Sequence, residues 1–550
     1  MKMIQLVRCE FIKNFSMKRL IVTVLVLTLC CFGFIKFEEF YKGNSYSEPL
    51  LVSEKEFERR YENAKKDYAD ADDVIQEGIF SSYEKILSTY QWVNPEVFNS
   101  EKDDWQEQTL YEIQYYIPQL EAMITLKENY QSPTLKTYLE NHEKYNVSNE
   151  SVFVEAHYIS TLNHYFDFEL SEIEKEITFL KSQISLLDEA IQKNLYYLVS
   201  QFSYNQILFD AEKHDVALSK AAVETYQYMI KRKILDPNDY RALNAREYQF
   251  LAYNEEERHI PTLEEYKKGL ANPDFNGYAA SKRYNLIMRE EQNKQKKILK
   301  YAMDHELKHD VYLKGDDVDS LYSTSKNFMN LGLHLGIVIL FLSAIYHAGI
   351  VAKEHDKGTI KLLLTKPIKR EKILLSKIIY LILDTYLLWL LGSLILFLMV
   401  GFYSGFGDLF TAKLLVSHGE VVEVNYWLWY FKELLICGIP ICCFQVVLFS
   451  LSALTLSTSL TASIISILTV FSFMVWFLIS QLGLTFLDFL SYTPIPYLDY
   501  WFVRYNSRIY LEAVVRSNVF TGYGLLIGIV VAILLTIITL FVYRKRDIKN

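Results

Sequence analysis

The chain of 550 residues is 51% hydrophobic and 22% charged, and its net charge of −9 is unevenly spread. Residues 1–38 and 328–550 together carry 23 Lys and Arg against 14 Asp and Glu, whereas residues 39–327 carry 34 against 52. This composition excludes collagen-like, low-complexity and disulfide-scaffold proteins, and the acidic segment argues against a nucleic-acid partner because it would repel phosphate. The sequence predicts a long acidic segment inserted into an apolar, basic-flanked remainder.

The first 19 residues have the pattern of an amphipathic helix. Ile4, Val7, Phe11 and Phe15 fall on one helical face, with basic residues between them. Such a helix lies in the membrane interface, and the alternative is a flexible tail. The apolar run that follows lacks the small-x-small pattern of a cleavage site, so we expect an uncleaved membrane anchor.

Six apolar stretches are long enough to cross a bilayer about 30 Å thick. We expect these spans at 20–37, 328–352, 378–402, 434–456, 462–480 and 523–543. Basic residues collect in the segments that should face the cytoplasm, which are 1–19, 353–377 and 544–550, with a short cytoplasmic turn at 457–461. The outer segments are then 38–327, 403–433 and an interfacial or re-entrant stretch at 481–522.

This topology predicts a multi-pass protein of the cell membrane with both termini inside. The acidic segment contains none of the six cysteines, so it has no disulfide if it lies outside the cell. The absence of disulfides and the abundance of Tyr, Lys, Ile and Asn favour a Gram-positive bacterium.

The acidic segment has the composition of a helical domain, rich in Glu, Lys, Tyr and Leu. Its clearest pattern is a run of apolar residues with alternating gaps of three and four, which predicts a coiled-coil-like seam. The seam consists of Leu170, Ile173, Ile177, Leu180, Ile184, Leu187 and Ile191, and resumes at Leu198. Its partner is a helix of the same domain or of another copy, and the other amphipathic stretches favour the former.

One short motif near the end of this segment matches H-E-x-x-H. His305 and His309 would share a helical face and could hold Zn²⁺, with Glu306 as the base. No third ligand follows at the spacing that such sites use, and the surrounding helix is strongly charged. We therefore expect an exposed helical face without metal, and keep a membrane-anchored zinc protease as the alternative.

The cytoplasmic segment 353–377 carries a second pattern. Gly358 and Thr359 indicate a break and a helix start, a Leu cluster around Leu363 follows, and Pro367 ends it. A short helix fixed between two spans could be pushed by a soluble partner; the alternative is a plain loop whose charge sets topology. Within the next span, Asp384 is a costly ionisable group that could form an interhelical hydrogen bond or contact a substrate.

These features together resemble the ABC-2 type transporter permeases. The residues that carry the resemblance are Glu354, Gly358, Thr359, Leu363, Pro367, Arg370 and Lys377. The resemblance extends to six spans, an N-terminal interfacial helix, the Ser/Thr-rich turn near 457–459 and the basic C-terminal end. It implies a mainly α fold with a six-helix membrane domain. The large all-α extracellular domain that we expect between the first two spans is a departure, because many members of the family have a shorter segment there.

The same resemblance implies a permease that works with a separate ABC ATP-binding subunit. The chain contains no Gly-Lys dipeptide and so no G-x-x-x-x-G-K-[ST] phosphate loop; we expect ATP and Mg²⁺ to be bound by that partner. Two permease halves are implied, either two copies of this chain or this chain with a sister permease, surrounded by membrane lipid. An amphiphilic peptide, lipid or drug is the expected cargo. A ligand-sensing membrane protein is a further alternative.

Overall fold

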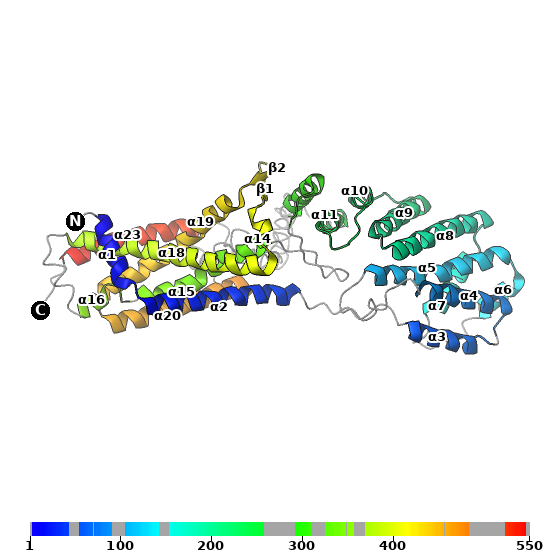
Figure 1. Ribbon diagram of the computed structural model, residues 1–550, viewed down its shortest axis with the longest axis horizontal. Helices are drawn as coiled ribbons and strands as arrows, with labels where there is room; N and C mark the ends of the chain where they lie inside the picture. The colour runs from blue at the N-terminus through cyan, green and yellow to red at the C-terminus, as the bar shows by residue number, and fades with distance from the viewer. Residues whose placement is uncertain are drawn as a thin grey trace, which may run out of the picture. The chain divides into compact units, whose positions relative to one another are not determined.

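The computed structural model describes most of the chain, which divides into two compact units (Figure 1). The first, here called the apolar unit, comprises Met1–Tyr41, Arg258–Ile298 and Ser323–Asn550, and the second, the insert unit, comprises Lys42–Glu257 and Leu299–Tyr322. The described residues are 3–42, 54–69, 71–90, 105–141, 153–257, 292–309, 325–347, 349–356, 369–455, 457–482 and 523–545.

The apolar unit is a helical bundle with one small hairpin. Its helices are α1 (Met3–Asn14), α2 (Met17–Lys42), α14 (Ser325–Asn330), α15 (Gly336–His347), α16 (Ala352–Asp356), α18 (Arg370–Ser404), α19 (Tyr426–Thr455), α20 (Thr458–Leu482) and α23 (Tyr523–Lys545), with 3₁₀ turns η4 (Leu331–Leu335) and η5 (Gly407–Phe410). Helix α18 packs against α1, α14, α15, α19 and α23, and α19 packs against α15, α16, α18, α20 and α23, so these two helices connect most of the described bundle.

Close packing in this bundle depends on glycines and on satisfied polar groups. The Trp389 indole donates a hydrogen bond of 2.8 Å to the carbonyl of Gly332, and the hydroxyls of Ser393 and Tyr430 lie 2.9 Å apart. A Cβ at Gly332 would lie 2.5 Å from the Tyr430 hydroxyl. Pairing polar groups between helices is what a low-dielectric interior requires, and these contacts join α18 to α19 through Ser393 and Tyr430 and to η4 through Trp389 and Gly332.

The membrane-span prediction is confirmed in its coarser form. Among the described residues, four helical stretches are long and apolar enough to cross a bilayer: Phe328–Glu354, Arg370–Ser404, Tyr426–Thr455 and Leu526–Lys545. A fifth arises if α1 and the following Met17–Gly33, which meet at 79°, count as one broken span. Within α20, the apolar stretch Ser459–Ser472 is shorter, so the count of six stays a prediction.

Two helices begin before the apolar spans that the sequence predicts within them. Helix α18 starts at Arg370 rather than at residue 378, so Arg370 and Lys377 belong to the helix and not to the preceding loop. Helix α19 starts at Tyr426 rather than at residue 434. At 1.5 Å per residue, the 35 residues of α18 extend about 52 Å, well beyond the hydrocarbon layer.

The segment between these two helices folds into a hairpin that the sequence analysis did not anticipate. Strands β1 (Lys413–Ser417) and β2 (Glu420–Val424) pair antiparallel, with Ser417 opposite Glu420. His418 and Gly419 both have positive φ, at 51° and 88°. This is the conformation that a two-residue hairpin turn of the primed type requires.

The insert unit is built from helices alone within its described residues. They are α3 (Glu54–Asp67), α4 (Asp73–Tyr90), α5 (Trp105–Glu128), α6 (Pro133–Asn141), α7 (Phe153–Tyr165), α8 (Leu170–Lys193), α9 (Tyr196–His214), α10 (Lys220–Lys231), α11 (Tyr240–Glu257) and the later helix 292–305, which the unit boundary divides. Helix α5 packs on α4, α7 and α8, and neighbours in sequence continue the stack through α9, α10 and α11 (Figure 1).

The apolar seam of α8 has its partner within this unit. Ile173, Ile177, Leu180 and Leu187 are buried in one cluster with residues of α4, α5 and α7. The seam does not continue as one helix to Leu198, because Asn194 adopts a left-handed conformation (φ 54°) that ends α8. The packing partner is thus intramolecular, and the stripe past Asn194 belongs to α9.

Candidate functional site

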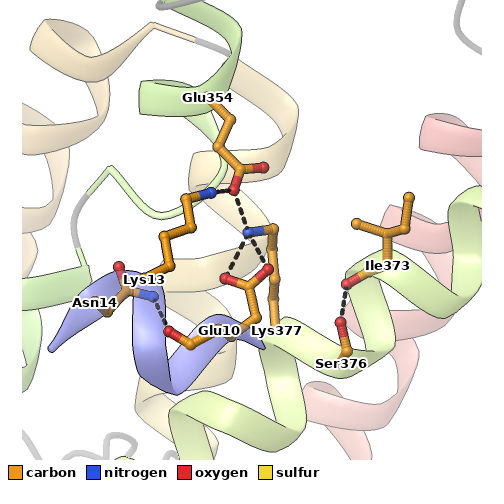
Figure 2. Close-up of polar contacts among 7 residues, drawn as sticks. All are labelled: Glu10, Lys13, Asn14, Glu354, Ile373, Ser376 and Lys377. Atoms are coloured by element: carbon orange, nitrogen blue, oxygen red, sulfur yellow. Dashed lines mark hydrogen bonds and ion pairs between the residues drawn. The ribbon is translucent and has the colours of Figure 1, made fainter. Parts of the chain in front are cut away.

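Four charged side chains meet where the N-terminal helix α1 crosses the beginning of α18. The Lys377 ammonium lies 2.9 Å from both carboxylate oxygens of Glu10 and 2.7 Å from Oε1 of Glu354, and Lys13 donates to the same Glu354 oxygen (Figure 2). We call these four residues the α1 clasp. Glu10 and Lys13 come from α1, Glu354 from α16 and Lys377 from α18, so three helices are joined.

The clasp is buried and balanced in charge. Lys377 is 1% exposed, Glu354 4% and Glu10 6%, while Lys13 reaches in from the surface. Two cations face two carboxylates, which is the condition under which buried ions are tolerated. Removing one partner of a buried pair typically costs 3–5 kcal/mol, because a charge is left uncompensated. The arrangement therefore fixes the docking of α1.

Local sequence explains why α1 presents Glu10 inward. Leu6, Val7 and Glu10 form the buried face of α1, and Phe11 meets the Tyr380 ring edge-on at 4.8 Å. Of the predicted apolar face, Val7 docks against the bundle, whereas Ile4 is 80% exposed. The helix turns its inner face to protein, and a second apolar stripe remains outside.

A second cluster lies one to two turns further along α18. Arg19 at the start of α2 pairs with Asp384 and donates 3.0 Å to the Tyr380 hydroxyl, while its guanidinium lies 4.2 Å from the Tyr346 ring centre. The His347 Nε2 atom lies 3.1 Å from the same Asp384 carboxylate. Asp384 thus makes interhelical contacts to Arg19 of α2 and His347 of α15. An interhelical contact was one of the two roles that the sequence left open for Asp384.

The residues predicted to couple the chain to a partner are described only in part. Gly358, Thr359, Leu363 and Pro367 lie outside the described residues. Of the other three, Arg370 is the first residue of α18. Glu354 precedes the segment 357–368 and Lys377 follows it, and the clasp joins these two side chains. The clasp therefore ties both sides of this segment to α1.

The H-E-x-x-H motif does not form a zinc-binding helix. The helix 292–305 ends at His305, and Glu306 follows with φ 53°, so His305 and His309 do not share a helical face. The Glu306 carboxylate pairs with Arg232, and the His305 ring stacks on Tyr301 with 4.0 Å between centres. Within the described part of the chain, no three His, Cys, Asp or Glu side chains are grouped to hold a metal ion. The zinc-protease alternative is not favoured.

Sequence reasoning found Glu354, Lys377 and Asp384 but missed Glu10, Lys13 and Arg19. A signal was present: Glu10 is the only acidic residue among the first 37, in an otherwise basic stretch. A single carboxylate in a basic helix suggests a buried cation as its partner, but only the crossing of α1 over α18 identifies that cation as Lys377.

Apolar helices of membrane-spanning length, joined to an N-terminal helix by buried ion pairs, define the class of multi-span membrane proteins. The sequence profile described as ABC-2 family transporter protein matches residues 4–548, nearly the whole chain. The chain belongs to the ABC-2 transporter family.

Among curated proteins, the chain resembles the uncharacterized protein YhcI of Bacillus subtilis (strain 168). The two are 35% identical over 128 residues, which is 23% of this chain and 37% of YhcI. The aligned region thus spans little more than a third of that relative's length. No solved structure matches the chain.

Proposed function

We propose that this ABC-2 permease works as one half of a transporter that is driven by ATP, bound with Mg²⁺ and hydrolysed by a separate ABC ATP-binding subunit. The second half is another copy of the chain or a sister permease. The observation that carries the proposal is the α1 clasp, because it ties together the two sides of the segment 357–368 where a cytoplasmic partner would push.

The clasp gives this segment a rigid base. A force on 357–368 acts on α16 at one side and on α18 at the other, and Lys377 links both to α1. Movement of the segment would then displace α16, α18 and α1 together rather than bending a loop. Because α18 packs against α1, α14, α15, α19 and α23, such a displacement would reach most of the described bundle.

The proposed cargo is an amphiphilic molecule, such as an antimicrobial peptide, a lipid or a drug, moved outward across the cell membrane. The insert unit is proposed to lie outside the cell, since residues 39–327 carry an acidic excess, whereas Lys and Arg are in excess in the segments expected inside. Its charge would attract cationic ligands over long range, which favours cationic peptides among the possible cargoes.

The main claim is tested with inside-out vesicles that contain the chain with or without a co-purified ATP-binding subunit. We expect the two to copurify in stoichiometric amounts and a fluorescent cationic antimicrobial peptide to accumulate only with both proteins, ATP and Mg²⁺. Accumulation by this chain alone in nucleotide-free vesicles would contradict the proposal.

The role of the clasp is tested with Lys377→Met, with Lys372→Met on the same helix as the control because Lys372 is exposed. We expect Lys377→Met to leave ATP hydrolysis by the partner measurable but to lower peptide accumulation per ATP at least tenfold, and Lys372→Met to change the ratio less than twofold. Gly358→Pro, within the segment itself, should act like Lys377→Met. An unchanged ratio in both Lys377→Met and Gly358→Pro would rule out mechanical coupling through this segment.

A further inference from the structure

Three polar side chains lie along the contact between α15 and α19 without pairing with one another. Gln445 of α19 donates a 3.3 Å hydrogen bond from Nε2 to the carbonyl of Leu340, which places its amide beside the next turn of α15. Ser343 lies in that turn and His347 one turn beyond it, so both follow Leu340 on one face of α15. Among the described residues, Gln445 Oε1, Ser343 Oγ and His347 Nδ1 have no hydrogen-bond partner.

The burial of these side chains makes the missing partners informative. Gln445 and Ser343 are 0% exposed and His347 is 4% exposed. A buried hydroxyl in a helix can bond to the carbonyl four residues before it, as Thr385 of α18 and Ser450 of α19 do at 2.9 Å. Ser343 makes no such bond within the described part of the chain. Because native proteins pair nearly all buried polar groups with protein or with ordered water, the missing partners indicate a bound molecule.

The unpaired groups continue along α19 toward the end of the helix. Ser452 lies seven residues after Gln445, which is two turns along the same helical face. It is 0% exposed, and its Oγ has no partner among the residues that the structure describes. One turn further, the hydroxyl of Thr455, the last residue of α19, meets that of Thr461 near the start of α20. The polar stripe of α19 thus runs from the middle of the helix to the end that is predicted to face the cytoplasm.

The chemistry of the unpaired atoms indicates which molecule fills these positions. Asp384 is paired with Arg19, so it is a carboxylate and accepts the hydrogen of His347 at Nε2, 3.1 Å away. The His347 Nδ1 atom is then an acceptor, as is the Gln445 amide oxygen, whereas the serine hydroxyls donate or accept. The unpaired set contains no carboxylate for a metal ion, and it suits water, which both donates and accepts. Ionisable groups inside membrane proteins also face water-filled regions or the protein interior.

We propose that a file of bound water molecules lies between α15 and α19 and supplies the missing hydrogen bonds. Its polar contacts are Gln445, Ser343, His347 and Ser452. Water donates to the Gln445 Oε1 and His347 Nδ1 atoms, and it donates to or accepts from the two serine hydroxyls. Because His347 also contacts Asp384, the file brings water from the cytoplasmic end of α19 to a charged residue inside the bundle.

The test measures deuterium exchange at the C2 position of the histidine rings, by mass spectrometry at pH 8, in the purified full chain held in phosphatidylcholine nanodiscs. His418, exposed in the hairpin turn, is the internal reference. We expect His347 to exchange within about tenfold of His418, because bound water reaches its ring. In a dry interior the His347 ring would exchange only when the bundle opens, which would slow it by about a thousandfold or more.

A combined Ser343→Ala and Gln445→Leu variant removes two polar contacts of the file and leaves His347 in place. We expect His347 exchange in this variant to slow by about tenfold or more, since the water loses its partners. The matched control, Thr385→Val with Ser450→Ala, removes two hydroxyls that are equally buried but bonded within their own helices. His347 in the control should exchange as in the wild-type chain.

The comparison of His347 with His418 in the wild-type chain needs no substitution, so it decides the matter even if the combined variant fails to fold. A wider gap between the two wild-type rates, an unchanged His347 rate in the combined variant, or the same slowing in the control would each overturn the proposal. The assay contains neither ATPase nor cargo, so its outcome is independent of whether the chain transports a peptide.

Discussion

At the scale of single residues, burial decides the state of Glu155 in the insert unit. Glu155 on α7 is 2% exposed, and the Tyr83 hydroxyl of α4 donates a 2.8 Å hydrogen bond to its carboxylate. Burial raises the pKa of Glu155, and the hydrogen bonds from the backbone and from Tyr83 offset this only in part, so that the pKa lies at about 7. The carboxyl is therefore protonated in the fold at pH values where it would be ionised in the unfolded chain.

This shift predicts that the insert unit loses stability as pH rises. A folded pKa above the unfolded value means that the native state binds the proton more tightly, so the free energy of unfolding falls between pH about 4.5 and 7. A shift of this size corresponds to about 3 kcal/mol. Glu155→Gln should remove this dependence and stabilise the unit at pH 8.

The quantity to measure is the urea midpoint for unfolding of the insert unit. It is determined by pulse proteolysis of the full chain between pH 4.5 and 8. Glu140→Gln, an exposed residue at the end of α6, is the control and should retain the wild-type pH dependence. A wild-type midpoint that rises between pH 5 and 7 would contradict the expected sign.

At the scale of helices, a small residue at a crossing allows a neighbouring helix to approach closely. Gly78 of α4 allows Tyr158 of α7 to pack against the helix backbone, since a Cβ at Gly78 would lie 1.9 Å from the Tyr158 hydroxyl. Tyr158 is fully buried and bonded to Thr125 of α5, so it cannot move aside. The crossing of α4 and α7 depends on this glycine.

Gly78→Ala should therefore destabilise the insert unit by about 1–3 kcal/mol through overpacking, although Ala favours helices over Gly by about 1 kcal/mol. Gly33→Ala in α2, where an added Cβ meets no atom within 4 Å, is the matched control and should be neutral or stabilising. Thermal unfolding of the full-length Gly78→Ala and Gly33→Ala variants, monitored by circular dichroism, compares their effects on stability. Equal effects would show that Tyr158 does not constrain Gly78.

At the scale of the whole molecule, the membrane topology determines on which side of the membrane each segment lies. Val216 follows α9 in the insert unit and is 62% exposed, and Cys9 on α1 is an exposed native cysteine. If the insert unit lies outside and α1 inside, a membrane-impermeant maleimide should label a Val216→Cys variant in intact cells. Cys9 should react only after lysis. Labelling in the opposite order would invert the predicted orientation of every span.

Much of the organisation could be read from the sequence, because it depends on local composition and periodicity. The apolar stretches, the helical acidic insert and the ABC-2 pattern around Glu354 and Lys377 are of this kind, and each needs only neighbouring residues to be recognised. Helix ends were harder to predict. Arg370 looked like a loop residue because of its charge, but α18 extends beyond the apolar stretch that a bilayer demands.

The amino-acid sequence by itself determined the family, the helical class and the apolar segments of this protein, since hydropathy and spacing are properties of the chain alone. Only the tertiary structure decided which charges meet. Glu10 and Lys377 are separated by 367 residues, and Arg19 and Asp384 by 365. Likewise, a left-handed Glu306 ended the helix that a zinc motif would need. Such outcomes depend on the packing of distant helices and on backbone turns, because a buried ion is stable only where another segment supplies its partner.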